Sequence, residues 1–179
     1  EMAVRRSTST DEGDRLMIIN DDDGSIACYT LLRSQNVIAP SEWTTSGEFI
    51  NIGVDVDTIY VVVKRNVNGA DVYDVETFDT NILVDCALSG GAASSVNVTH
   101  LEDETVSIIR DGVVEPEQTV PASPFTVTFA QPATASYQVG LNFTPEIKTL
   151  PGKPRPPSRT IKGIKKLIFE VTPQLIQTQ

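Results

Sequence analysis

The chain has 179 residues, a mass of 19.4 kDa and a formal net charge of -10. This length suits one medium domain or two small ones, with a core that needs no disulfide or metal to stabilise it. Hydrophobic residues make up 40 % of the chain, which excludes the disordered class of low hydrophobicity. The longest apolar runs, such as Ile59–Val63, are too short for a membrane-spanning helix. The acidic balance argues against a surface devoted to binding nucleic acid.

Short apolar runs separated by turn residues dominate the first half. The predicted strands are Arg15–Asn20, Ser25–Leu32, Phe49–Val54, Thr58–Arg65 and Asp71–Phe78. Five consecutive apolar residues in Thr58–Arg65 are typical of a strand buried on both faces. The pair Asn68-Gly69 predicts a tight hairpin. Asp21-Asp22-Asp23-Gly24 is interpreted as a solvated hairpin turn, because Leu31 stands where a calcium loop would need an acid; a weak surface cation site is the alternative.

The second half repeats this pattern after a stretch of small residues. Four groups of residues show the alternation of a strand, with apolar residues predominant: Val96, Val98 and His100; Val106, Ile108 and Arg110, which lead into a turn; Phe125, Val127 and Phe129; and Tyr137, Val139 and Leu141. Asp111-Gly112 predicts a second hairpin. The prediction is an all-β fold, with antiparallel propeller-blade-like strands over 1–84, a linker over 85–95, and a small β-barrel or sandwich domain over 96–179. The nearest approach to a helical pattern, Ile161–Leu167, is interrupted by Gly163.

Few residues support catalysis. His100 is the only histidine, so we expect it to be packed or hydrogen-bonded at a strand end rather than to act as a general base. Cys28 and Cys86 are predicted to be buried free thiols, and their spacing predicts no metal site and no cofactor. Carboxylate pairs such as Glu102 and Glu104 would need a cleft that nothing in the sequence indicates. The sequence therefore predicts a protein that is not an enzyme.

Charge is divided unevenly along the chain. Residues 1–117 contain 7 basic and 22 acidic side chains, whereas residues 118–179 contain 7 basic and 2 acidic ones. The basic residues of the second part all lie in a proline-rich loop over 148–166: Lys148, Lys153, Arg155, Arg159, Lys162, Lys165 and Lys166. We expect this loop to contact a partner, first of all the acidic body of a neighbouring copy. Contact with nucleic acid and the absence of any specific partner are the alternatives.

Several short motifs resemble a family of phage tail proteins. In the second half these are His100-Leu101-Glu102 with Asp111-Gly112, Val139-Gly140-Leu141-Asn142-Phe143 with Ile147–Pro151, and Lys162–Val171. In the first half they are Asp23–Ala27, Gln35–Ala39 with Trp43 and Gly47, and Ile59–Arg65 with Val75-Glu76. With these motifs the chain resembles the nozzle-type (tail tubular B-like, or DNA-stabilisation) structural proteins of tailed bacteriophages.

The resemblance implies an internal fragment of a larger protein made of propeller-like blades and an inserted small β-barrel. Six copies would form a ring below the head–tail adaptor, and its lumen would conduct DNA during ejection. The expected partners are other copies, the adaptor and other tail proteins, with at most transient contact with DNA and none with a membrane. The expected location is the virion tail, after synthesis in the cytoplasm of a host bacterium.

A second hypothesis is a non-catalytic β-sandwich that serves as a binding or adhesion module of a larger surface protein. The sequons at Asn97 and Asn142 and the acidic balance are compatible with it, although no secretory leader is visible near Glu1. The small number of aromatic residues argues against it, because a sugar-binding platform usually needs several. Loss of glycan binding on Trp43→Ala would distinguish the two hypotheses.

Overall fold

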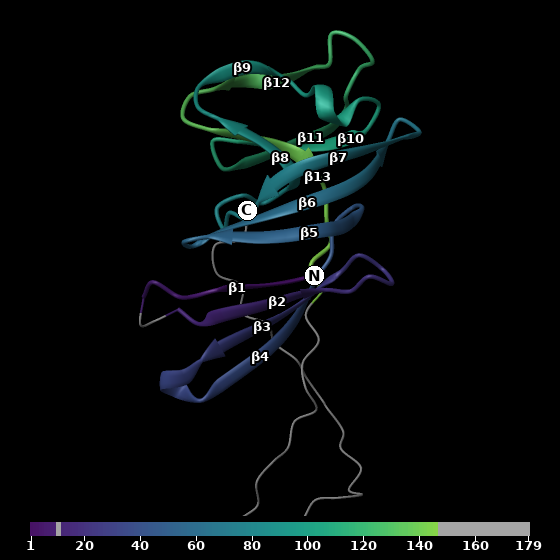
Figure 1. Cartoon of the computed structure of the whole chain (residues 1–179). Coiled ribbons are helices and arrows are strands. Elements are labelled where there is room, and N and C mark those ends of the chain that lie inside the picture. The colour runs from purple at the N-terminus through teal and green to yellow at the C-terminus, as the bar shows by residue number, and fades with distance from the viewer. Residues whose placement is uncertain (10–11, 147–179) are drawn as a thin grey trace, which may run out of the picture. The chain divides into compact units, whose positions relative to one another are not determined.

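The computed structural model describes residues 1–9 and 12–146. One compact unit covers Glu1–Phe143, and the account below concerns this unit alone. Its strands are all antiparallel, and the only helices among the described residues are two short 3-10 turns, so the predicted all-β fold is confirmed (Figure 1). None of the helices in this part of the chain has the length and apolarity needed to cross a membrane.

The first sheet is an up-and-down meander of four strands. In spatial order they are β1 (Met2–Arg5), β2 (Asp14–Ile19), β3 (Ile26–Leu32) and β4 (Val37–Trp43). The one-turn helix η1 (Arg33–Gln35) occupies the expected polar break between β3 and β4. Sequence analysis did not predict β1 and β4. Both are edge strands, and β4 exposes nearly all its side chains and contains Pro40, so it lacks the burial pattern that reveals a strand.

The Asp21–Gly24 segment forms the hairpin turn between β2 and β3, as predicted. Gly24 takes a left-handed conformation with φ 66°, and its N–H donates to the carbonyl of Asn20 at 2.8 Å. Asp23 accepts the N–H of Ser25 at 2.9 Å, and this hydrogen bond lowers the pKa of the Asp23 carboxyl. The Asp23 carboxylate therefore acts here in turn formation.

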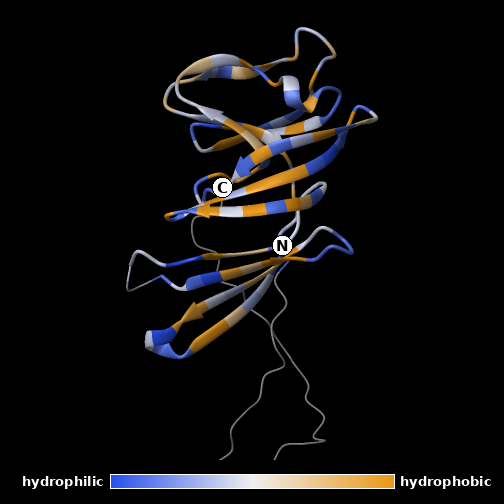
Figure 2. Ribbon diagram, in the orientation of Figure 1, coloured by the Kyte–Doolittle hydropathy of each residue, from blue (hydrophilic) through white to orange (hydrophobic). Residues whose placement is uncertain are grey.

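The second sheet has three strands: β5 (Glu48–Asp55), β6 (Thr58–Val67) and β7 (Ala70–Thr77). Asn68 and Gly69 have φ of 49° and 78° in the tight turn between β6 and β7, so the predicted hairpin is confirmed. The prediction that β6 is buried on both faces was wrong. Alternate side chains from Ile59 to Val67 are buried, whereas Tyr60 on the opposite face is exposed. Figure 2 shows orange, hydrophobic stretches beside blue, hydrophilic ones along this sheet. A sheet with only one covered face produces this pattern.

The remaining strands form two facing sheets around one core, a sandwich arrangement. One sheet has the order β11 (Val113–Thr119), β10 (Thr105–Arg110), β13 (Tyr137–Leu141) and β8 (Asp85–Gly90). The other pairs β12 (Thr126–Ala133) with β9 (Ala93–Asn97). The alternating residues Val106, Val127 and Val139 are buried as predicted, at 0–1 % exposure. Asp111-Gly112 forms the predicted hairpin between β10 and β11.

Two local expectations for residues 85–100 differ from the structure. The segment 85–95 was expected to be a linker, but it supplies β8 and the first half of β9, because β8 pairs with β13 along its length. The alternation of Val96, Val98 and His100 does not continue along one strand. Strand β9 ends at Asn97, and His100 lies in the one-turn helix η2 (Thr99–Leu101), which turns Leu101 into the core.

A second core joins the first two sheets. Met17, Ile26 and Cys28 of the first sheet pack with Phe49 and Val63 of the second. The β2–β3 turn also bonds to the start of β5, where the N–H of Phe49 donates to the carbonyl of Gly24 at 2.8 Å. The first two sheets are therefore held together by shared apolar packing and by main-chain hydrogen bonds.

Candidate functional site

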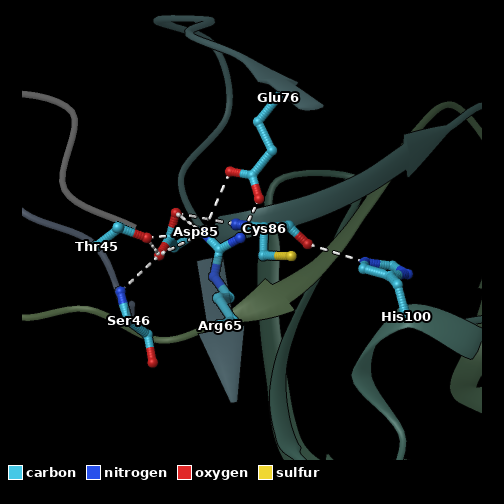
Figure 3. Close-up of polar contacts among 7 residues, drawn as sticks. All are labelled: Thr45, Ser46, Arg65, Glu76, Asp85, Cys86 and His100. Carbon is cyan, nitrogen blue, oxygen red and sulfur yellow. Dashed lines mark hydrogen bonds and ion pairs between the residues drawn. The ribbon is translucent and has the colours of Figure 1, made fainter. Parts of the chain in front are cut away.

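The most elaborate polar arrangement in the described chain is centred on the buried side chain of Arg65 (Figure 3). Along β6 the buried face carries Ile59, Val61 and Val63, and Arg65 takes the next position on that face. The opposite residues on β7 share this face, so Glu76, which is paired with Val61, points toward the guanidinium. Arg65 Nη1 forms an ion pair with Glu76 Oε1, and its Nη2 donates to Oε2 at 3.2 Å.

The same guanidinium also reaches two other parts of the chain. Its Nη2 donates to the hydroxyl of Thr45 at 2.7 Å, in the connection between β4 and β5, and lies 3.4 Å from Asp85 Oδ1 at the start of β8. Thr45 and the N–H of Ser46 in turn donate to Asp85 Oδ2, at 2.6 and 3.2 Å. One buried side chain thus connects the exit of the first sheet, the second sheet and the start of the sandwich.

Opposing effects act on the charge of Arg65. Burial disfavours the charged form, but the Glu76 hydrogen bond and the neighbouring carboxylates outweigh it and raise the pKa of Arg65. The guanidinium is therefore charged at any physiological pH. A buried charge of this kind is stable only while its partners remain in place.

Cys86 and His100 lie beside this cluster but do not form a catalytic pair. His100 Nε2 lies 3.1 Å from the carbonyl oxygen of Cys86, and since a carbonyl only accepts, the imidazole donates there (Figure 3). Burial raises the pKa of the Cys86 thiol to about 12, even though Arg65 is nearby. A protonated thiol whose neighbouring imidazole is bonded to the main chain is not an activated nucleophile.

The face of the cluster toward η2 carries further potential ligands. Asp74, Glu76 and Cys86 each offer one ligand atom, and these three atoms lie within 4.8 Å of one another. Asp74 Oδ2 is buried and has no hydrogen-bond partner among the residues that the structure describes. Asp74 and His100 also line a cavity of about 240 Å³ between β7 and η2, together with Val72, Thr99 and Glu102.

A second polar cluster lies at the β10–β11 turn. Asp111 accepts the N–H groups of Thr134, Ala135 and Ser136, and these bonds hold the pKa of its carboxyl far below the ordinary value. Burial acts to raise the pKa of Glu115, but the N–H of Ala130 and the side chain of Arg110 outweigh it and lower the pKa. Both carboxylates are used to fix connections between strands.

The structure agrees with several of the site-level predictions and leaves others open. Cys28 and Cys86 are buried free thiols, as predicted, and His100 is hydrogen-bonded. The seven basic residues of the 148–166 loop lie outside the described residues. Sequence reasoning missed Arg65, Glu76 and Asp85. The available signal was the arginine itself, because it continues the alternation of Ile59, Val61 and Val63 at a position that should face the core.

Comparisons with known proteins do not identify a family for this chain. No protein-family model matches the sequence, and the search of curated proteins finds no match.

Proposed function

We propose that this chain is a structural module of a phage tail nozzle ring, which forms the conduit for DNA ejection and acts by subunit packing rather than by catalysis. The observation that carries the proposal is the polar cluster around the buried Arg65, whose partners Glu76, Asp85 and Thr45 are half-buried. Hydrogen bonds and ion pairs link consecutive β-sheets through four side chains: Arg65, Glu76, Asp85 and Thr45. That arrangement suits a module under mechanical load. The phage identity itself depends on the sequence resemblance, and the β-rich fold is compatible with its propeller and barrel parts.

Exposed apolar surface on the second sheet supports a role in assembly. The outward face of β6 and β7 carries Tyr60, Tyr73 and Val75, and the last two are 63 % and 73 % exposed. Strand β4 lies at the edge of its sheet in the described part of the chain, with Ile38 at 70 % exposure. Surfaces of this kind mark contacts with other chains. The proposed partners are other copies in a ring, the head–tail adaptor and other tail proteins.

The charge distribution is consistent with a conduit. The large excess of acidic side chains in residues 1–117 repels phosphate, so passing DNA would slide rather than bind. The basic segment 148–166 would then contact the acidic body of a neighbouring subunit. In this proposal the protein is made in the host cytoplasm and resides in the virion tail.

Peptide mass spectrometry of purified phage particles from the source culture tests the proposal. Peptides of this chain should come from a particle band much heavier than 19.4 kDa. Charge reversal at Arg155, Arg159 and Lys162 in the full-length protein should reduce ring assembly and particle yield, while Arg6→Glu on the body should not. Absence of these peptides from particles, or normal assembly of the triple variant, would contradict the proposal.

The alternative of a carbohydrate-binding sandwich receives less support from the structure. The Trp43 ring packs against Phe78 with ring centroids 4.7 Å apart, and the Arg15 guanidinium lies 5.7 Å from its centre. This half-buried tryptophan already packs against other side chains, which makes it a poor stacking platform for a sugar. A glycan-binding screen with a response lost in Trp43→Ala would restore the alternative.

A further inference from the structure

Three side chains with ligand atoms converge where β7 meets β8. Asp74 and Glu76 are two residues apart on β7 and therefore point to the same face. Cys86, from the start of β8, brings its sulfur to within 4.8 Å of one oxygen of each carboxylate. Ligand atoms around a tetrahedral zinc ion lie about 3.5 Å apart, given metal–ligand bonds of about 2.0–2.3 Å. Rotations of these side chains that shorten the gaps by about 1 Å would suffice to enclose an ion.

One carboxylate oxygen of this cluster lacks a hydrogen-bond partner within the described residues. Among the described residues, Asp74 Oδ2 is shielded from solvent yet accepts no hydrogen bond. Buried polar atoms are nearly always satisfied, and an exception points to a water or an ion that belongs there. The guanidinium engages Glu76, Asp85 and Thr45, and no donor in the described part of the chain reaches Asp74 Oδ2.

The formal charges of the cluster favour a positively charged partner. Asp74, Glu76 and Asp85 carry three formal negative charges around the single positive charge of Arg65. Once Cys86 binds as a thiolate, the negative charges exceed the positive one by three, and this excess favours a divalent cation. One sulfur with two carboxylate oxygens suits zinc or a similar borderline metal, whereas calcium and magnesium take oxygen ligands only.

We propose that Asp74, Glu76 and Cys86 bind a divalent metal ion of the zinc type. Three protein ligands leave a fourth position for water, and one of the ligands, Asp74, also lines the cavity of about 240 Å³. As the metal–sulfur bond forms, the Cys86 thiol releases its proton to bulk water, and no group is oxidised or reduced. The bound ion joins β7 to β8, so it stabilises the connection between the second sheet and the sandwich. This inference does not depend on the proposed role in a phage tail.

Cobalt(II) reports on such a site directly, because a thiolate bound to it gives a charge-transfer absorption band in the near ultraviolet. The whole 179-residue chain, stripped with a chelator, is titrated with Co²⁺ and then with Zn²⁺. The expected result is a band that saturates at one ion per chain and disappears as zinc displaces cobalt. Cys28→Ser, which removes the other buried thiol, is the matched control and should keep the band.

Two variants make the test specific to the cluster. Cys86→Ser should abolish the band, and Asp74→Asn, which preserves side-chain shape, should weaken Co²⁺ binding about tenfold or more. Far-UV circular dichroism confirms that each variant is folded before titration. Zinc should also raise the melting temperature of the original chain but not that of Asp74→Asn. The proposal is overturned if the folded original chain gives no band, if the band survives in Cys86→Ser, or if Asp74→Asn binds with unchanged affinity, as a water-filled cluster would predict.

Discussion

Asp111 accepts both the N–H and the hydroxyl group of Thr134, each at 2.9 Å. The same carboxylate accepts the N–H groups of Ala135 and Ser136, so one side chain fixes the β10–β11 turn against the connection between β12 and β13. Asp111 also takes a left-handed backbone conformation with φ 50°, which aspartate and asparagine tolerate better than most residues. A turn residue thereby controls the geometry of a distant loop.

This relationship predicts a specific response to acid. The pKa of Asp111 is lowered in the folded state, so its contribution to stability is present above the ordinary carboxyl pKa and is lost as the pH falls toward the folded value. Asp111→Asn keeps the turn but removes the charge. Its melting temperature should be lower than that of the original chain at pH 7, and the difference should shrink below about pH 4. A difference that stays constant from pH 7 to pH 2 in thermal denaturation would contradict this role.

Replacement of Arg65 should be costly, because it leaves the Glu76 and Asp85 carboxylates without their cation. We expect Arg65→Met to reduce the free energy of unfolding by about 3 kcal/mol, at the lower end for a broken buried ion pair because both carboxylates keep some solvent contact. Arg33→Met is the control. Its side chain is 87 % exposed beside Asp14, so the change should stay within about 0.5 kcal/mol. Urea denaturation measures both, and equal losses would show that the Arg65 cluster is not a structural centre.

Two glycines that lie in strands should differ in how much stability the chain loses when each is replaced by alanine. A Cβ at Gly140 would lie 2.4 Å from the carbonyl oxygen of Asp85, a main-chain atom of the neighbouring β8. Gly140→Ala should therefore disturb the β13–β8 pairing and destabilise the chain by about 1–3 kcal/mol. A Cβ at Gly53 would meet nothing within 4 Å, so Gly53→Ala should not destabilise. The melting temperatures decide the question, and a Gly140→Ala variant as stable as Gly53→Ala would count against the close approach of β13 and β8.

Neither cysteine should react with thiol reagents while the metal-free chain is folded. Burial raises the pKa of Cys28, and it raises that of Cys86 to about 12, so both thiols are protonated at pH 8 as well as shielded. Labelling with a chromogenic disulfide at pH 8 should be slow in buffer and rapid in denaturant. The single variants Cys28→Ser and Cys86→Ser assign each phase. Rapid labelling of folded Cys86 would show that this region opens to solvent.

The sequence by itself determined the features that depend on near neighbours. Alternation at Val106, Val127 and Val139 indicated which faces are buried, because side chains in a strand alternate between faces whatever the partner strand is. Asn68-Gly69 and Asp111-Gly112 located two hairpins, since both turn positions need a left-handed backbone. The all-β class and the burial of both cysteines followed from these local patterns.

Only the tertiary structure decided the features that depend on which strands meet. Edge strand β4 has no buried face to mark it, and small residues become strand β8 because β13 is there to pair with them. Arg65 looked like the polar end of an apolar run until Glu76 and Asp85 were brought to it from other strands. Pairing register and sheet packing set such contacts between residues far apart in the chain, and no local pattern encodes them.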